Sequence, residues 1–258
     1  MIRQFKALWE RRHILIYLVI SELKRLYRNK VLGYLWSLLD PLCMMAVYVL
    51  LVVFIFQRGG PQFPVLLFSA LLAWWWFVYS VSSSVTSIAG KAKLIQSVYF
   101  PKAILPLEKV LVGLVRYLLG LIVLAPLLLI FEANITINVL WLPVLILVQL
   151  LFTAGCSFFF AALGVYFSDL QNVVRFLLRA WFFLSPALYL ATERIPQQYQ
   201  AIYMLNPFAA LFTSYKNILV FGLPPNEYML VATVVAVVIF LGGFAFFTQR
   251  EPAFAKAV

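Results

Sequence analysis

The sequence is poor in the residues on which enzymes and soluble proteins depend. Charged residues make up 11% of its 258 positions, and it holds one histidine, His13, and two cysteines, Cys43 and Cys156. Both cysteines lie within apolar runs, which indicates small buried side chains rather than a disulfide or a metal site. A single histidine outside the apolar runs argues against a Ser/His intramembrane protease and against a histidine metal site. We therefore predict no catalytic residues and no metal site.

The sequence also lacks a GxxxxGK[ST] loop, so the chain has no usual cradle for the phosphates of ATP. No polar segment is longer than about 40 residues, which argues against a separate soluble domain and predicts one domain over 1–258. The first apolar run, HILIYLVI, is followed by basic residues and not by a small-residue cleavage site. We therefore expect no cleavable signal peptide at the N-terminus.

What the sequence has in abundance is apolar residues. They make up 65% of the chain, with a mean hydropathy of +0.99, whereas soluble proteins hold roughly 45–50%. This composition predicts an all-α, polytopic membrane protein. The net charge of +11 comes from basic residues that flank the apolar runs, where they set orientation and face anionic lipid rather than nucleic acid.

Apolar runs of about 20 residues are long enough to cross a bilayer as helices. They predict six spans inside a core at 33–248, the first of them with a kink or break at Asp40-Pro41. The expected spans are 33–56, 64–89, 103–131, 139–167, 173–191 and 228–247.

Two further segments are apolar in part but too short to span. Residues 1–30 form a basic segment whose first part, 1–12, places Phe5, Leu8 and Trp9 on one helical face. That pattern predicts an amphipathic helix in the membrane interface, with a disordered basic tail as the alternative. Residues 193–227 predict two re-entrant or interfacial helices broken at Asn206-Pro207.

The basic residues are distributed unevenly between the two expected sides of the membrane. The N-terminal segment, the second and fourth connecting loops with their flanks, and the C-terminus carry 17 Lys and Arg, against 3 on the opposite side. The positive-inside rule therefore predicts that both termini are cytoplasmic.

The second expected span carries a tryptophan triplet and a row of serines. At 100° per residue, Ser69, Trp76 and three later serines fall on one stripe. Aromatic faces stack on sugar rings, and hydroxyls exchange hydrogen bonds with them, so this span predicts the wall of a sugar conduit. An aromatic belt, core packing or close helix packing are the alternatives. The candidate path residues are Trp74, Trp75, Trp76, Ser80, Ser83, Ser87 and Trp181.

The loop after this span is basic, and Pro101 and Pro106 bracket the point at which the chain enters the next span. Because the prolines limit how its backbone flexes, we predict that it couples the spans to an ATPase or acts as a gate. An ordinary basic loop anchored by aromatics is the alternative. The candidate coupling residues are Lys91, Lys93, Tyr99, Phe100, Pro101 and Lys102.

Four separated motifs resemble those of type-2 ABC exporter permeases that move polysaccharides, and the resemblance runs from Tyr27 to Phe247. Lys91 or Lys93 stands where that family often has Asn, so no role of that Asn transfers. The motifs are Tyr27-Arg28 with Leu32-Gly33, Trp36 and Pro41; Val98-Tyr99-Phe100-Pro101-Lys102 with Ile104-Leu105-Pro106; Tyr166-Phe167-Ser168-Asp169-Leu170 with Trp181–Pro186; and Leu205-Asn206-Pro207.

The resemblance implies a permease subunit in the bacterial inner membrane that exports a lipid-linked polysaccharide, closest to O-antigen. It implies a homodimer, two copies of a separate ATPase that binds ATP and magnesium, an undecaprenyl-linked substrate, contacts with membrane lipids, and no cofactor on this chain. An exporter of capsule or teichoic acid is the nearest alternative.

Two alternatives come from other classes of protein. A proton-coupled secondary transporter needs paired ionisable groups within the membrane, for which the candidates are Asp40, Arg116, Asp169, Arg175 and Arg179. An intramembrane enzyme acting on lipid-linked sugar would use Asp40 and Asp169 as its carboxylates.

Overall fold

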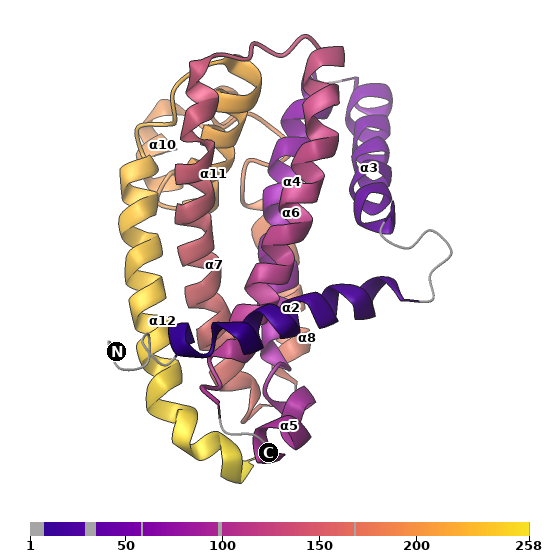
Figure 1. Ribbon diagram of the computed structural model, residues 1–258. Helices are drawn as coiled ribbons and strands as arrows, with labels where there is room; N and C mark the ends of the chain where they lie inside the picture. The colour runs from indigo at the N-terminus through magenta and orange to yellow at the C-terminus, as the bar shows by residue number, and fades with distance from the viewer. Residues whose placement is uncertain (1–7, 29–34, 58, 98–99, 168, 258) are drawn as a thin grey trace.

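The computed structural model describes residues 8–28, 35–57, 59–97, 100–167 and 169–257. Every regular element in these ranges is helical, as predicted. The long helices stand side by side, and α2 (Arg12–Tyr27) lies across them near one end of the bundle (Figure 1). Most of the predicted helix at 1–12 and Tyr99 of the predicted coupling loop lie outside the described residues.

Within the described ranges, four helices are long and apolar enough to cross a membrane. The first three match predicted spans closely, whereas the fourth continues past 247 through the polar residues Gln249 to Glu251. These helices are α4 (Phe63–Val85), α6 (Ile104–Ile130), α7 (Leu142–Gly164, after the short η4, Ile137–Trp141) and α12 (Met229–Ala257).

The other two predicted spans form shorter or less regular helices. The first consists of α3 (Trp36–Val49), which passes through Pro41, and the π-helical η2 (Leu50–Ile55). The helix is therefore not broken at Asp40-Pro41, a kink there stays a prediction, and the irregular turns lie farther along. In place of the predicted 173–191, α8 (Leu170–Phe183) has 14 residues, about 21 Å of helix against roughly 30 Å of hydrocarbon.

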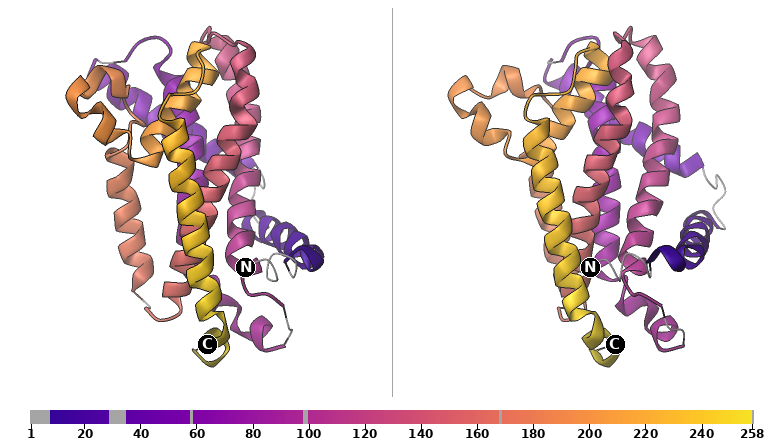
Figure 2. Two further views of the ribbon diagram at one scale, coloured as in Figure 1. Left: turned by 90° about the vertical axis from the view of Figure 1, so that its left-hand side faces the viewer. Right: turned by 60° about the vertical axis from the view of Figure 1, so that its left-hand side comes forward.

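The predicted break at Asn206-Pro207 is confirmed. Asn206 caps α11 (Pro207–Lys216) by accepting a hydrogen bond from the backbone N–H of Phe208 at 3.1 Å. The other elements here are α9 (Ala191–Arg194), α10 (Gln197–Tyr203) and η5 (Asn217–Phe221). The short helices α9 and α10 stand out to one side, at the end of the bundle far from α2 (Figure 2).

The end near α2 also carries η3 (Ala89–Lys91) and α5 (Ala92–Ser97), which lie at the level of the C-terminal end of α12 (Figure 2). Within the expected interface segment at 1–30, α2 covers mainly residues beyond the predicted helix at 1–12, and its Leu18 and Tyr27 are buried.

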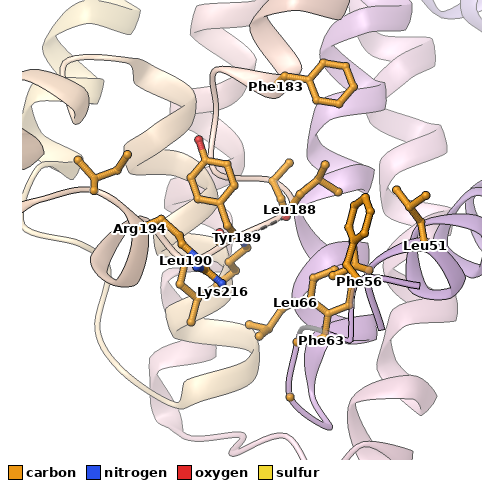
Figure 3. Close-up of a pocket in the computed structure, with 15 residues that line it drawn as sticks. Leu51, Phe56, Phe63, Leu66, Phe183, Leu188, Tyr189, Leu190, Arg194 and Lys216 are labelled. Carbon is orange, nitrogen blue, oxygen red and sulfur yellow. Dashed lines mark hydrogen bonds between the residues drawn. The ribbon is translucent and has the colours of Figure 1, made fainter. Parts of the chain in front are cut away.

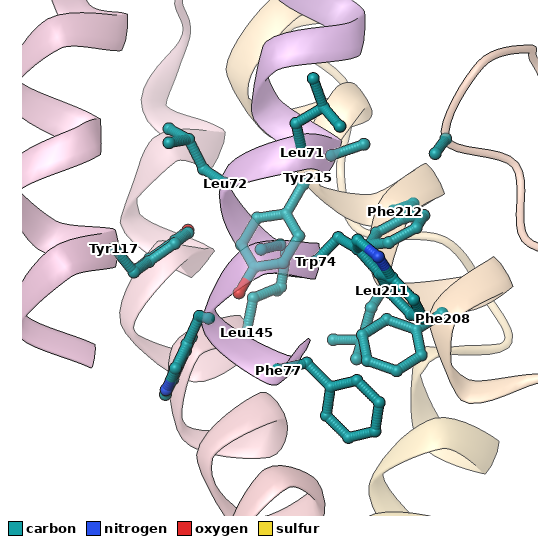
Figure 4. Packing of buried hydrophobic residues seen from close by; sticks show 14 of the residues in the cluster. Leu71, Leu72, Trp74, Phe77, Tyr117, Leu145, Phe208, Leu211, Phe212 and Tyr215 are labelled. Atoms are coloured by element: carbon teal, nitrogen blue, oxygen red, sulfur yellow. The ribbon is translucent and has the colours of Figure 1, made fainter. Parts of the chain in front are cut away.

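Helix α4 is the centre of the core and packs against α3, α6, α7, α8 and α11. Its Trp74 and Phe77 meet Phe208 and Phe212 of α11 (Figure 4), with the Trp74 and Phe208 rings edge to face at 5.0 Å between centroids. Aromatic pairs of this geometry add about 0.5–1.5 kcal/mol beyond the area they bury. Helix α11 is therefore held in the bundle by edge-to-face contacts between aromatic rings.

Helices α7 and α12 approach each other closely through glycine. A Cβ placed on Gly155 would lie 2.5 Å from the carbonyl oxygen of Ile239, and one on Gly243 would collide with the carbonyl oxygen of Gly155. In lipid, helices associate through such close backbone packing rather than through a hydrophobic force. The crossing therefore requires glycine at both positions.

We predict that Gly243→Ala destabilises the protein by about 1–3 kcal/mol, because the added methyl group forces the two backbones apart. Gly242→Ala is the matched control, since a Cβ there meets nothing within 4 Å. Thermal unfolding of both variants in detergent checks this. Equal stability of the two variants would contradict the close crossing.

Candidate functional site

A cavity among the described helices lies between α3, α4 and α8. It has a volume of about 620 Å³, and its walls combine apolar side chains with Trp75, Arg175 and Arg179. We call it the α3–α8 cavity. The two arginines are exposed and lie on the flank of α8 next to its buried residues Val174, Leu178 and Phe182, so the cavity pairs aromatic surface with positive charge.

A smaller cavity of about 290 Å³ lies between α3, α4 and α6, and we call it the α3–α6 cavity. It is lined by apolar residues together with Asp40, Tyr79 and Arg116. Trp75 borders both cavities, so its half-buried indole forms part of the wall between them.

The three tryptophans of α4 point in different directions from the helix and lie in three different environments. Trp74 packs in the aromatic core and touches the α3–α8 cavity. Trp76 is buried, and its indole N–H donates to the carbonyl of Val110 at 3.0 Å. Trp75 alone of the three is half-buried and lines both cavities. Of the triplet, Trp75 is therefore the residue most available to a ligand.

The predicted serines serve the packing of α4 in this structure. The hydroxyl of Ser80 donates to Trp76 O at 2.7 Å, and that of Ser87 donates to Ser84 O at 2.7 Å, while Ser83 is half-buried. Bonds of this kind agree with the alternative of close helix packing, and a role in a sugar path stays a prediction.

Trp181 joins two motifs that are distant in sequence. Its indole N–H donates to Asn206 Oδ1 at 3.0 Å, and Asn206 Nδ2 donates to the hydroxyl of Ser185 at 3.0 Å. The Trp181–Pro186 motif and the Leu205–Pro207 motif thus form one unit at the end of α8.

Lys216 supports the same non-helical turn from α11. Its Nζ is buried and donates to the carbonyls of Pro186, Tyr189 and Ala187 at 2.5, 2.8 and 3.3 Å. Together with Arg194 and Tyr189 it borders a third cavity of about 590 Å³ between η2, α4 and the turn (Figure 3). The sequence analysis assigned no role to Lys216, because its carbonyl partners lie 27 to 30 residues away in the sequence.

At the opposite end, a charge cluster connects α2, α6 and the loop after α4. Lys109 Nζ lies 2.6 Å from Glu22 Oε1 and 3.2 Å from Glu108 Oε1, and Lys91 Nζ lies 2.6 Å from Glu108 Oε2. Arg25 adds two further bonds to Glu22, both at 2.8 Å. Hydrogen bonds from Arg25 and then from Lys109 lower the pKa of Glu22 to about 2. The sequence analysis missed this cluster because Glu22 and Lys109 are 87 residues apart.

The predicted coupling residues are divided between buried and exposed positions. Lys91 belongs to the charge cluster, and Lys102 binds Glu251 of α12 through both its N–H, at 2.7 Å to Oε1, and its Nζ, at 3.1 Å to the carbonyl. Phe100 is buried in a second core cluster with Leu18 of α2. Pro101 is half-buried, whereas Lys93 is exposed on α5. The loop is thus tied to both α2 and α12.

The carboxylates proposed for an intramembrane enzyme lie on different elements. Asp40 faces the α3–α6 cavity from α3, whereas Asp169 is exposed at the start of α8.

Comparison with known proteins adds independent information. The ABC-2 type transporter family matches residues 13–220. An O-antigen export system permease protein, RfbA, from Myxococcus xanthus is 36% identical over 260 residues, covering all of both chains. RfbA from Klebsiella pneumoniae is 27% identical over 244 residues, 94% of each chain. The polysialic acid transport protein KpsM of Escherichia coli is 25% identical over 250 residues, 92% of this chain and 93% of its own.

We predict that Glu22→Gln lowers the free energy of unfolding by about 2 kcal/mol at pH 7, because the buried Lys109 then keeps only Glu108 as a counter-charge, which it shares with Lys91. Glu10→Gln, at an exposed position of the same segment, is the control and should be neutral.

The pH dependence of this effect follows from the lowered pKa of Glu22. Its stabilising contribution is present above pH 4.5 and is lost as the pH falls toward 2. Thermal unfolding in detergent should therefore show the difference between wild type and Glu22→Gln shrinking below pH 4.5. A difference that is absent at pH 7 would rule out the cluster as a stabilising contact.

Proposed function

Because the chain belongs to the ABC-2 type transporter family, we propose that it is the membrane-spanning permease subunit of an ABC exporter that carries lipid-linked O-antigen polysaccharide across the bacterial inner membrane. The observation that carries this proposal is the 36% identity, over the whole length of both chains, to an O-antigen export permease. Export of capsular polysaccharide is the second candidate, supported by the lower identity to KpsM. Membership of an ABC transporter family disfavours the proton-coupled transporter and the intramembrane enzyme.

The energy would come from two copies of a separate ATPase that bind ATP and magnesium, since the sequence has no phosphate-binding loop. The end that carries α2 and α5 is the proposed cytoplasmic end, supported by its many basic residues. On α5, Lys93, Gln96 and Ser97 are exposed, and the helix lies at the level of the C-terminal end of α12 (Figure 2). It is the proposed contact with the ATPase.

Force applied at α5 would reach the spans through its ties to the rest of the chain. Lys91 connects it through Glu108 and Lys109 to α2, and Lys102 connects the loop to α12. Phe100 would act inside this unit, because it is buried against the protein's own core.

The conduit would lie against the face formed by α3, α4 and α8. Large apolar side chains such as Met44, Phe176 and Phe183 are exposed there, and the α3–α8 cavity indents this face with Trp75 and the α8 arginines. A second copy of the chain, related by two-fold symmetry, would cover the apolar residues and enclose a path between the two cavities. An undecaprenyl-linked chain of sugars would then slide over aromatic surface.

We predict that Trp75→Ala lowers export of long polymer severalfold while the complex still assembles, because a stacking surface is lost and no buried hydrogen bond is broken. Trp141→Ala, at an exposed tryptophan of η4 away from the cavities, should export normally. The measurement is surface polysaccharide length and amount in cells that depend on the variant, with membrane levels of the protein determined in parallel. Wild-type export by Trp75→Ala would assign the residue to packing.

Orientation and ATPase docking are testable with single cysteines in a chain whose Cys43 and Cys156 have been replaced. We expect Gln198→Cys, in α10, to react with an impermeant maleimide in intact spheroplasts, and Gln96→Cys, in α5, to react only after lysis. Binding of the ATPase should then protect Gln96→Cys and leave Gln198→Cys reactive. Labelling of Gln96→Cys in intact spheroplasts would reverse the orientation, and reactivity unchanged by the ATPase would remove α5 as its docking site.

A further inference from the structure

Arg116 is a charged residue whose position the proposed export path does not explain. It lies in α6, seven residues after Lys109 and so on the same helical face, about 10 Å farther along the helix from the charge cluster. Within the described part of the chain its guanidinium makes no ion pair, and its Nε is buried with no hydrogen-bond partner. A charge at this depth needs a compensating group, since leaving it unpaired is costly.

Tyr79 is the nearest polar neighbour of Arg116. The guanidinium carbon stands 4.9 Å from the centroid of the Tyr79 ring, a cation–π contact. This contact uses the ring and leaves the phenol free: the Tyr79 hydroxyl is also buried without a hydrogen-bond partner among the described residues. The α3–α6 cavity is thus lined by Tyr79 from α4 and Arg116 from α6, and each has a buried polar atom without a hydrogen-bond partner among the described residues.

Asp40 borders the same cavity from the opposite helix, α3, and makes no ion pair with Arg116. The remaining walls are apolar and include Leu72, Trp75 and Val78. The cavity thus offers a positive and hydroxyl-bearing wall, a negative rim, and an apolar lining within about 290 Å³. That volume suits a small polar group attached to hydrocarbon, since sites for drug-sized ligands start at roughly 300 Å³.

We propose that the α3–α6 cavity binds the headgroup of a zwitterionic aminophospholipid, with the phosphate at Arg116 and Tyr79 and the ammonium group at Asp40. A phosphate accepts charge-assisted hydrogen bonds from the guanidinium and the phenol, and a primary ammonium pairs with the carboxylate. The acyl chains leave along the apolar surfaces of α3 and α6. The ligand satisfies all three polar side chains at once.

The depth of the site agrees with a lipid in the leaflet nearest α2. Side chains on a helix lean toward its N-terminus, and the N-terminal end of α6 is the end near α2 (Figure 1). Arg116 therefore leans back toward the level at which α2 lies across the bundle, which is where headgroup phosphates are expected.

Asp40 is what separates this ligand from two others that also carry phosphate. An anionic phospholipid would place its phosphate at Arg116 but leave Asp40 facing a ligand without a cation. An isoprenoid diphosphate, the anchor expected of the exported substrate, would bring still more negative charge toward that carboxylate. The zwitterionic headgroup is the one that complements both charges.

The test uses the purified full-length chain in mild detergent, with native mass spectrometry in the presence of phosphatidylethanolamine, phosphatidylglycerol or an isoprenoid diphosphate. The wild type should retain phosphatidylethanolamine over phosphatidylglycerol by about tenfold, the ratio expected from one added charge pair of modest strength. Asp40→Asn should abolish that preference, and Tyr79→Phe should weaken binding of both phospholipids while keeping the ring. Arg116→Gln should lose both, and Arg250→Gln, at an exposed arginine of α12, should behave as wild type.

Equal retention of the two phospholipids by the wild type, or an unchanged preference in Asp40→Asn, would overturn the proposal. Displacement of phosphatidylethanolamine by the isoprenoid diphosphate at equal concentration would assign the cavity to the substrate instead. The measurement needs neither ATPase nor polysaccharide, so its failure would leave the proposed export function untouched. Asp40→Asn and Tyr79→Phe are small changes that keep the test decisive even where Arg116→Gln does not fold.

Discussion

The constraint on which this structure depends is that backbone N–H and C=O groups inside a membrane must find partners within the protein. Helix α8 is about 21 Å long, so the chain after Phe183 continues toward the membrane surface without helical hydrogen bonds. Lys216 supplies what is missing, because its three N–H groups bind three carbonyls of that turn. Asn206 adds hydrogen bonds to the side chains of Trp181 and Ser185 at the end of α8. The break at Asn206-Pro207 therefore helps to satisfy these carbonyls, because it places α11 where Lys216 can reach the turn.

The same reasoning applies to charge at the other end. Glu108 is fully buried and Glu22 nearly so, and each depends on a lysine partner to offset the hydration that its carboxylate loses. The pairing links an interface helix, the start of a long span and the connecting loop into one unit. A stretch that reads in the sequence as an ordinary basic loop is consequently held at both sides, by Glu108 and by Glu251.

The features that the sequence predicted correctly depend on residues close together in the chain, and those that it missed depend on contacts between distant residues. Hydropathy placed the long spans well because each depends on its own residues, and the cap at Asn206 was predictable because it is local. The length of α8 and the roles of Lys216 and Glu22 could not be predicted from the sequence, since they depend on partners tens of residues away. The tryptophan triplet shows the same limit: each residue turns 100° from the last, and only the packing around α4 decides which of the three meets a cavity. Arg116 was noticed as an intramembrane charge, but its unpaired state is a property of three helices together.

The glycine crossing between α7 and α12 has a mechanical consequence. Two backbones in direct contact cannot slide past each other without a clash, so we expect the two helices to move together as a rigid pair. Helix α12 is about 43 Å long by the rise of an α-helix; it packs on α11 near one end and holds Lys102 through Glu251 near the other. If force enters at the loop, as proposed, a tilt of this helix pair would be carried to α11, which packs on α12, while α3 and α8, which have few contacts with the pair, would be free to part.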